Sequence, residues 1–597
     1  MARKRTYSNK RPRGAGTSTG RLTYGELEQR RRAVERETVS PGPPARRANG
    51  GPAPRGPLKM PGKAGGRTKS RRVPANGGRR GITGLHVAIA AAVLLAVVIP
   101  IWLFGFVLPS PIGGLAPASG SYVKTPDVQV EATVRSSFKP SDVKLTVDGK
   151  DASGNLQVKG SRVRTTVALA DGKHKAFLSV KTGGLVSNRS ASWSFEVDST
   201  PPRINLTRSR IVATKDPEAV EVKIEGTVER GATLKADGKP LTVDRKGHFK
   251  GSAPGSRSRS FAVTAVDRAG NESAAYVVTQ KATAAKGAHV SVFIAASDSD
   301  FQKMISLVER TELNALQVDL KDEAGQVAYA SDYPLVQQAN AANNWIKLDS
   351  CVDQMRYKDV YSICRVVCFK DPKLTKARPD LAVQDNAGGP WGKGFWLDPY
   401  SREVWDYNLS VAEAAARAGF NEVQFDYVRF PSDGNTSTCV FPHQDGRKPV
   451  QVIDDFLAYA RERLAPYNVF ISADLFGLTA SKQGEMGIGQ SVKNVARRVD
   501  YISPMVYPSH YNPGEYNIKV PEANPGDTVT RSLEDFQKAM AGTPSKLRPW
   551  LQDFSLKITY TPDMVRRQID ACEKLGVNQW LLWDPNCSYS EAALKKK

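Results

Sequence analysis

The sequence predicts an α/β protein: a (β/α)8 barrel preceded by two all-β sandwiches, one transmembrane helix and a disordered basic tail. Three observations predict this architecture. Eight apolar runs, most of them separated by helical segments, fill about the last 310 residues; shorter alternating runs precede them; and one stretch near the N-terminus lacks charged side chains. A chain of 597 residues has room for about four domains. The expected units are the tail 1–80, the anchor 81–109, the sandwiches 110–199 and 200–282, and the barrel 287–597.

The barrel prediction rests on the period of its apolar residues. In the second strand, Val318 and Leu320 alternate with Gln317, Asp319 and Lys321. Apolar side chains of a barrel strand face the surrounding helices, so the polar set is expected inside. Eight such strands with intervening helices are typical of a TIM barrel. The strands are expected at Val290–Ala295, Ala315–Lys321, Tyr361–Phe369, Glu422–Phe430, Val469–Leu475, Tyr501–Val506, Arg548–Asp553 and Asn578–Trp583.

The two sandwiches are predicted from short alternating runs that end in turn signals such as Asp148-Gly149 and Asp171-Gly172. A second unit begins after Thr200-Pro201-Pro202. Its end, Ala265 to Asn271, resembles the closing strand and turn of bacterial immunoglobulin-like modules. Neither unit shows a cluster of aromatic residues suited to glycan binding, so we expect both to act as spacers.

The charge of the chain is concentrated in its tail. The whole chain has a formal charge of +25, and residues 1–80 hold 22 Lys and Arg against 4 Asp and Glu, so 25 − 18 leaves +7 for all the rest. The tail is rich in Gly, Pro, Ser and Arg and is expected to be disordered. It has no basic motif interleaved with aromatic residues, so nucleic acid is not expected as a partner.

Residues 85–108 carry no charged side chain. At 1.5 Å per residue they reach about 36 Å as a helix, enough to cross roughly 30 Å of hydrocarbon. Arg79 and Arg80 precede this stretch and no basic residue follows it until Lys124, so the positive-inside rule places the tail in the cytoplasm. The leader and the apolar run are both too long for a typical cleaved signal peptide. We therefore expect a single-pass cell-membrane protein with an extracellular barrel and membrane lipid as a partner of residues 85–108.

Acidic residues close six of the eight expected barrel strands. For each residue alone a structural salt bridge is the simpler interpretation, but active sites of such barrels lie at this C-terminal rim. Asp426 and Asp474 end neighbouring strands, and alternation points both inward. One ionised and one protonated carboxyl group are the minimum apparatus for cleaving a glycosidic bond. Neighbouring strands lie about 4.8 Å apart, near the roughly 5–5.5 Å separation of retaining enzymes.

Aromatic residues of the rim favour a sugar ligand, because flat rings stack on the C–H faces of sugars. Trp391 and Trp396, in or beside a glycine-rich stretch of the third loop, are the expected binding platforms. Other rim residues are expected to bind substrate hydroxyls or to line the cleft. The complete set of expected substrate-binding residues is Asp319, Lys321, Arg429, Trp391, Trp396, Tyr507, His510, Gln552 and Asp584.

Five stretches are long and follow one another in order along the barrel: Gln317–Asp322, Gly419–Pro431, Ser472–Gly477, Ser503–Tyr511 and Arg548–Phe554. Through them, residues from about 288 to 590 resemble a family of largely uncharacterised bacterial glycoside hydrolase-like barrels. The resemblance implies a glycosidase, in which Asp426 looks like the fourth-strand nucleophile of α-glycosidase barrels and Asp474 like an acid/base candidate. Many such barrels use glutamate as the acid, and this sequence departs from that pattern.

The sequence-based hypothesis is a membrane-anchored extracellular glycosidase that acts on a cell-envelope or environmental polysaccharide through Asp426 and Asp474. The rival is a non-catalytic envelope protein whose barrel only binds glycan. No cofactor or metal is expected, since His443 and His510 lack ligand spacing. The six cysteines show no CxxC pair, and Cys439 is placed to clip its loop by a disulfide.

Overall fold

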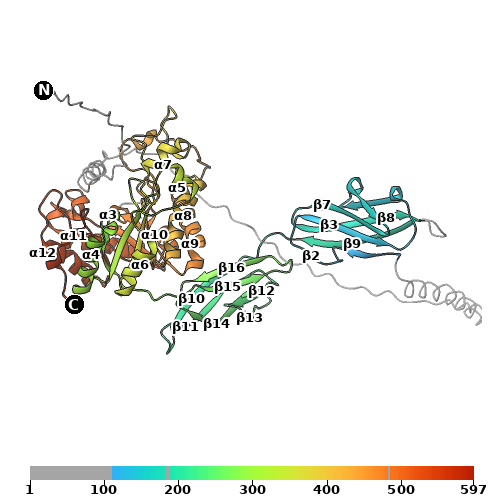
Figure 1. Cartoon of the computed structure of the whole chain (residues 1–597), viewed down its shortest axis with the longest axis horizontal. Coiled ribbons are helices and arrows are strands. Elements are labelled where there is room, and N and C mark those ends of the chain that lie inside the picture. Colours follow the sequence, from blue (N-terminus) through green and yellow to red (C-terminus); the bar gives the residue numbers. More distant parts are fainter. Residues whose placement is uncertain (1–110, 183–187, 482–484) are drawn as a thin grey trace, which may run out of the picture.

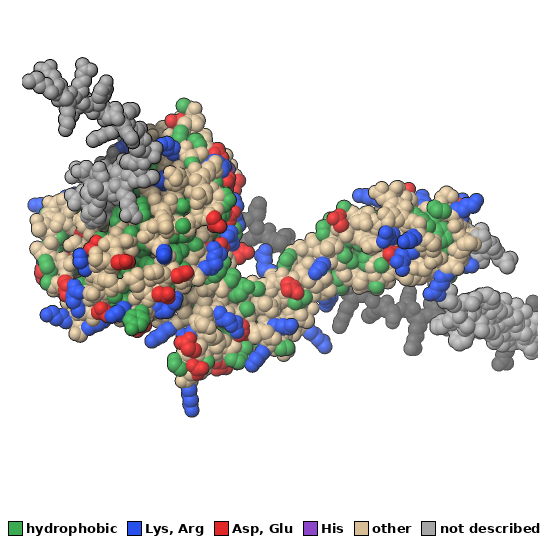
Figure 2. Space-filling model, in the orientation of Figure 1, with side chains coloured by type: hydrophobic (Ala, Val, Ile, Leu, Met, Phe, Trp, Pro, Cys, Tyr) green, Lys and Arg blue, Asp and Glu red, His purple; other side chains and the backbone are tan. Residues whose placement is uncertain are grey.

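The computed structural model describes residues 111–182, 188–481 and 485–597. Figure 1 shows a helix-rich barrel at one end and two β-rich modules beside it. The tail 1–80 and the expected anchor 85–108 lie outside the described residues. Within the described part of the chain, no helix combines the length and the apolar character needed to cross a bilayer. On the face shown in Figure 2, basic and acidic side chains are interspersed over the described surface.

The first module consists of two sheets, with strand orders β1-β3-β7-β6 and β2-β9-β8-β4-β5. Side chains from both sheets, Val130 and Trp193 among them, share one core. An antiparallel sheet buries alternate residues, which explains why the period-two pattern located these strands. The strands are β1 Ile112–Ala116, β2 Tyr122–Val123, β3 Asp127–Val134, β4 Val143–Val147, β5 Lys150–Asp151, β6 Gln157–Lys159, β7 Arg162–Ala168, β8 Gly172–Lys181 and β9 Asn188–Val197.

The second module also has two sheets, ordered β10-β11-β14 and β13-β12-β15-β16, around a core that includes Ile224 and Phe261. The immunoglobulin-like assignment of the two modules stays a prediction. The strands are β10 Asn205–Ala213, β11 Ala219–Thr227, β12 Thr233–Ala236, β13 Lys239–Leu241, β14 His248–Ser256, β15 Phe261–Val266 and β16 Glu272–Val277.

The barrel is closed and parallel. Its strands are paired in the order β17-β18-β19-β20-β21-β22, then β23 and β24, then β25, which pairs with β17 again. Strands β23 and β24 are two short pieces of the seventh barrel position, so the predicted eight-strand barrel is confirmed. The strands are β17 Lys286–Val290, β18 Ala315–Lys321, β19 Tyr361–Val367, β20 Glu422–Asp426, β21 Phe470–Phe476, β22 Tyr501–Met505, β23 Lys546–Leu547, β24 Trp550–Gln552 and β25 Trp580–Trp583.

Amphipathic helices surround the barrel (Figure 1). Helix α8 illustrates how they form: Ser401 caps its first turn, Val404 and Leu409 are buried against the sheet, and Gly419 ends it in a left-handed conformation. The helices are α3 Val292–Ala296, α4 Asp298–Arg310, α5 Pro334–Gln338, α6 Leu348–Tyr357, α7 Pro372–Ala377, α8 Arg402–Ala418, α9 Pro449–Leu464, α10 Val492–Arg498, α11 Pro525–Ala539 and α12 Pro562–Lys574.

Two local predictions were wrong. The first barrel strand was expected at Val290–Ala295, but β17 ends at Val290 and the following residues form α3. The side chain of Ser291 accepts a hydrogen bond from the Ile294 amide, so this serine caps a helix where the apolar run suggested a strand. The expected clip at Cys439 is also absent, because all six cysteines are free thiols.

The second module is docked on the N-terminal end of the barrel strands. Asn468, which precedes β21, accepts a hydrogen bond from the Thr279 amide at 2.6 Å and donates one to the Arg257 carbonyl at 2.7 Å. Ser260 donates to the Ala465 carbonyl at 2.7 Å. These contacts leave the opposite end of the barrel, where the strands terminate, clear of the second module.

An ion pair crosses the floor of the barrel. Glu422, the first residue of β20, is bound by both terminal nitrogens of Arg548, and both side chains are fully buried. Tyr361 donates a hydrogen bond to the same carboxylate at 3.0 Å, and the guanidinium lies 4.3 Å from the centre of the Tyr501 ring. The pair therefore connects β19, β20 and β22 with Arg548, which lies between β23 and β24.

Removing one partner of this pair is expected to reduce the free energy of unfolding by about 3–5 kcal/mol, because the remaining charge is buried without a counterion. Glu422→Gln and Arg548→Met test this by urea denaturation, and the double variant Glu422→Leu/Arg548→Met is expected to recover much of the loss. Asp353→Asn is the control: it breaks an exposed pair with Arg356 and is expected to cost less than about 1 kcal/mol. Single variants as stable as this control would contradict the prediction.

Candidate active site

Four charged side chains from four consecutive strands meet inside the barrel near its C-terminal rim. Asp319 on β18 is the register partner of Arg365 on β19. Asp426 and Asp474 each follow one member of the register pair Phe425–Ala473, so they occupy adjacent positions on β20 and β21. The predicted inward direction of these residues is what brings them together.

Arg365 connects the acidic groups. Its Nε and Nη2 donate hydrogen bonds to Asp426 Oδ2 at 2.9 and 2.6 Å, and its Nη1 donates to Asp319 Oδ1 at 3.0 Å. The Tyr427 amide donates to Asp426 Oδ1 at 2.6 Å. The Asp426 carboxylate therefore accepts three hydrogen bonds, two from the Arg365 guanidinium and one from a backbone amide.

Asp474 has a different environment. Its carboxyl group accepts a hydrogen bond from Trp550 Nε1 at 2.8 Å, and only 2% of the residue is exposed. Burial and the neighbouring Asp426 carboxylate raise the pKa of Asp474 well above its ordinary value, and they outweigh the lowering effects of the Trp550 hydrogen bond and of Arg365. Adjacent carboxyl groups with opposed environments are the arrangement that separates an acid from a base.

The network continues behind Asp319. His289 Nε2 lies 2.9 Å from Asp319 Oδ2, and the other ring nitrogen lies 3.8 Å from the sulfur of Cys587. The imidazole is fully buried and stacks on the Trp583 ring at 4.0 Å between centroids. Burial alone would lower the pKa of His289, but Asp319 and Cys587 raise it to about 9.

The remaining sequence-predicted residues fall into two groups. Tyr507 is close to the pair, since the Asp474 and Asp426 carboxylates add to burial in raising its pKa well above the ordinary value. His510, exposed, packs its ring against Tyr507 at 5.3 Å. By contrast, the side chains of Gln552 and Asp584 bind backbone amides. Gln552 accepts a hydrogen bond from the Ser509 amide, and Asp584 accepts hydrogen bonds from two amides of its own turn.

Lys321 lies outside this group. Its fully buried ammonium pairs with Asp371 at 2.9 Å, donates to the Val367 carbonyl at 2.7 Å and lies 5.1 Å from the Tyr407 ring of α8. The register shifts between Asp319 and Lys321, so strict alternation no longer holds at the end of β18. The structure therefore places Lys321 between the sheet and its helices.

The two expected aromatic platforms are buried. Trp391 is 7% exposed and donates from its indole nitrogen to Thr438, whereas Trp396 is 2% exposed and faces Asp433 at 3.5 Å. Both rings pack under the 432–448 insertion. Neither offers an open face in this structure, and a contact of either with a sugar stays a prediction.

Sequence reasoning placed Lys370 at the rim, at the end of the third strand, but missed Arg365 and His289. Arg365 lies within the apolar run of β19, two residues after Ile363. It therefore faces the same side of the strand as Ile363, which lies in the barrel interior. A single charged residue on the inward side of a buried strand was the available signal. His289 was hidden because the first strand was placed a few residues too late.

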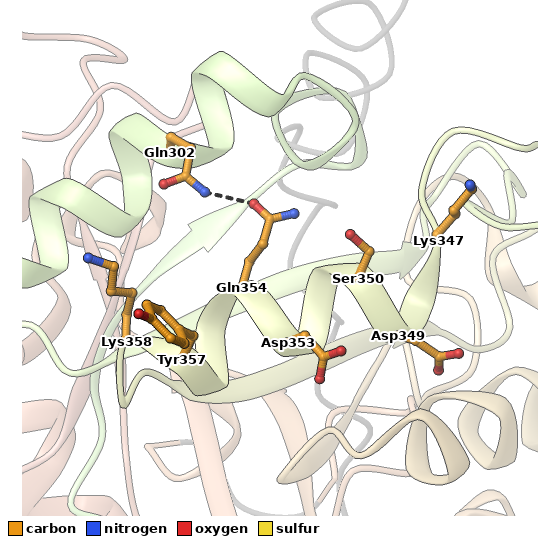
Figure 3. Close-up of a pocket in the computed structure, with 8 residues that line it drawn as sticks. All are labelled: Gln302, Lys347, Asp349, Ser350, Asp353, Gln354, Tyr357 and Lys358. Atoms are coloured by element: carbon orange, nitrogen blue, oxygen red, sulfur yellow. Dashed lines mark hydrogen bonds between the residues drawn. The ribbon is translucent and has the colours of Figure 1, made fainter.

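A separate surface depression of about 750 Å³ lies outside the barrel, beside α4 and α6. Figure 3 shows its lining, in which Gln302 donates a hydrogen bond to Gln354 at 2.7 Å and Tyr357 stands beside Lys358. It contains none of the rim residues, so it is not part of the candidate site.

Residues 287–589 match the model of a family described as "Putative glycosyl hydrolase domain". A hypothetical protein from Ruminiclostridium thermocellum ATCC 27405 is 37% identical, over 31% of this chain and 96% of that one, with a TM-score of 0.29. The glycoside hydrolase domain of PgaB (BpsB) from Bordetella bronchiseptica is 12% identical, over 53% and 100%, with a TM-score of 0.40. The spore cortex-lytic enzyme SleL of Bacillus megaterium QM B1551 is 11% identical, over 54% and 76%, with a TM-score of 0.33. No curated protein matches the chain.

The raised pKa of His289 predicts a pH dependence of stability. An unfolded histidine titrates near 6.5, so the folded state binds this proton more tightly. The resulting stability is fully present below about pH 6.5 and is lost as the pH rises through about 9. A shift of this size corresponds to about 3 kcal/mol. Urea denaturation between pH 6 and pH 10 should show that the wild type loses about this much more than His289→Gln; parallel curves would refute the assignment.

Proposed function

Because the chain belongs to this glycosyl hydrolase-like family, we propose that its barrel is a glycoside hydrolase whose catalytic groups are Asp426 and Asp474. The observation that carries the proposal is the contrast between two adjacent carboxyl groups. Asp426 accepts three hydrogen bonds, two of them from a guanidinium, whereas Asp474 is buried with a raised pKa. The proposed substrate is a polysaccharide of the cell envelope or of the environment.

In the proposed reaction, Asp474 donates its proton to the glycosidic oxygen while the bond from that oxygen to the anomeric carbon breaks. The Asp426 carboxylate attacks the same carbon and forms a glycosyl ester. Water then attacks this carbon, Asp474 takes the water proton, and the Asp426 carboxylate is released. Adjacent register positions favour this double displacement, because they leave less room for a water between the two carboxyl groups.

Arg365 has a positioning role in this mechanism. It holds the buried Asp426 carboxylate through two hydrogen bonds. Asp319 and His289 support Arg365 from the opposite side. A fixed guanidinium also keeps the nucleophile in one orientation before substrate binds.

We also propose that residues 85–108 anchor the protein in the cell membrane, with the barrel outside. The uncharged stretch and the basic residues before it support this topology. The docking of the second module on the N-terminal end of the barrel supports it too, because the rim then lies on the far side from the stalk.

Substitution of either aspartate is expected to lower turnover, but with different substrate dependence. Asp426→Asn should lower kcat by about 10³-fold on every substrate, because the nucleophile is lost. Asp474→Asn should lower kcat by about 10²–10⁴-fold on glycans and far less on aryl glycosides, whose leaving groups need no proton. Reducing-sugar and chromogenic assays on a glycan panel measure both. The matched control is Asp445→Asn, on the exposed insertion loop, which should keep wild-type rates.

The near-complete burial of both aspartates, 5% and 2% exposed, favours one alternative, a barrel that binds glycan without cleaving it. Binding without turnover, unchanged by Asp426→Asn, would establish this alternative and exclude hydrolysis. Thermal unfolding of each variant separates loss of activity from loss of fold.

A further inference from the structure

Two buried cations at the rim have no carboxylate partner. Lys370 is 1% exposed and Arg429 is 3% exposed, and within the described ranges neither forms an ion pair. The other fully or nearly buried cations of the barrel interior and its surroundings are all paired: Lys321 with Asp371, Arg365 with Asp319 and Asp426, and Arg548 with Glu422. The two unpaired cations therefore differ from the rule for buried charge.

Both cations lie directly beyond the catalytic aspartates. The Lys370 ammonium is 5.1 Å and the Arg429 guanidinium 4.9 Å from the centre of the Tyr427 ring, which follows Asp426 in the chain. Arg429 is also 4.3 Å from the ring of Phe476, two residues after Asp474 on β21. The same C-terminal rim thus holds the carboxyl pair and the two cations.

The hydrogen bonds of Arg429 leave one edge of its guanidinium available. Nη1 donates to the Phe430 carbonyl at 3.1 Å and to Ser432 Oγ at 2.9 Å. Nε and Nη2 have no hydrogen-bond partner among the described residues. Neither atom is among the fully buried polar atoms that lack a partner, so both remain accessible to solvent or to a ligand. The Lys370 ammonium likewise has no hydrogen-bond partner among the described residues and is not sealed from solvent. The Nε–Nη2 edge is the edge with which Arg365 holds Asp426, and it fits a carboxylate.

Among the described residues, the nearby carboxylates Asp426, Asp433 and Glu323 form no ion pair with Lys370 or Arg429, and Glu323 lies 3.5 Å from Arg365 instead. Asp426 is engaged by Arg365 and the Tyr427 amide, and Asp433 faces Trp396 and Ser432. Burial lowers the pKa of both Lys370 and Arg429, although Glu323 and Asp433 favour the charged form of Lys370 and Asp433 and Asp426 that of Arg429. An anionic group beside the two cations would restore the balance, and a planar carboxylate matches the guanidinium edge best.

We propose that the sugar unit bound at the Asp426–Asp474 pair carries a carboxylate, held by Arg429 through two hydrogen bonds and by Lys370 through its charge. The substrate class is then a uronic-acid-containing glycan. This inference rests on the proposed function for the position of the scissile bond, but the carboxylate subsite itself is tested by binding alone.

The experiment uses the full chain carrying Asp474→Asn, which retains Asp426 and its Arg365 pair, and measures binding by calorimetry. The probes are oligomers of glucuronate, galacturonate and mannuronate, each compared with its carboxyl-reduced counterpart of identical linkage. At least one acidic oligomer should bind tenfold or more tightly than its reduced form. Adding Arg429→Gln or Lys370→Met should each remove most of that preference and leave binding of the reduced form unchanged.

The matched control is Arg402→Gln, because Arg402 also lies over aromatic rings, those of Trp405 and Tyr459, but is exposed on α8. It should change neither affinity. Equal affinity for acidic and reduced oligomers, no binding of any acidic oligomer, or a preference that survives Arg429→Gln would each overturn the inference. Hydrolysis of a neutral glycan at rates unaffected by Arg429→Gln would also overturn it while supporting the proposed hydrolase. Tight binding of an acidic oligomer that the wild type does not hydrolyse would support the carboxylate subsite and contradict the proposed hydrolase.

Discussion

The rim of the barrel depends on one buried guanidinium. Arg365 takes two carboxylates from neighbouring strands, Asp319 and Asp426, and neutralises part of the charge that they bring into a space almost closed to water. Without it, three aspartates would face one another at low dielectric, and at least one would have to take up a proton. Arg365 binds Asp426 and not Asp474, so the two carboxyl groups of the pair have different hydrogen-bond partners.

The different surroundings of Asp426 and Asp474 involve residues beyond Arg365. Asp474 receives one indole N–H, from Trp550 on β24, whereas Asp426 receives two hydrogen bonds from the Arg365 guanidinium and one from the Tyr427 amide. The two carboxyl groups have the same chemistry and neighbouring positions, and the residues around them provide the difference. A floor of similar construction lies below, where Glu422 and Arg548 neutralise each other. The barrel interior therefore holds two charged layers. In the lower layer Glu422 and Arg548 neutralise each other, whereas the layer at the rim includes the unpaired cations Lys370 and Arg429.

Periodicity was enough to predict the barrel and the direction of its side chains, because each strand must show its apolar residues to the helices and its polar residues to the interior. It also predicted that Asp426 and Asp474 would be neighbours. Periodicity failed where local hydrogen bonding changes the backbone: Ser291 begins a helix inside an apolar run, and a register shift after Asp319 turns Lys321 out of the interior. The burial of Trp391 and Trp396 was not predictable, because it depends on how two long loops pack together, and loop sequences have no period.

Those loops determine what surrounds the charged groups at the rim of the barrel. The third loop and the 432–448 insertion are joined by a bridge between Gln384 and Val440 and by the hydrogen bond from Trp391 to Thr438. Each of them also contacts Arg429: the Trp396 ring centre lies 4.7 Å from the guanidinium, and Ser432 accepts a hydrogen bond from it at 2.9 Å, so the residue is only 3% exposed. Water exclusion strengthens every electrostatic interaction left in the cleft, including the attraction of the unpaired cations for an anion. Shielding by aromatic loops and selection for a charged sugar are then two consequences of the same packing, since a cation selects a carboxylate strongly only where water cannot replace it.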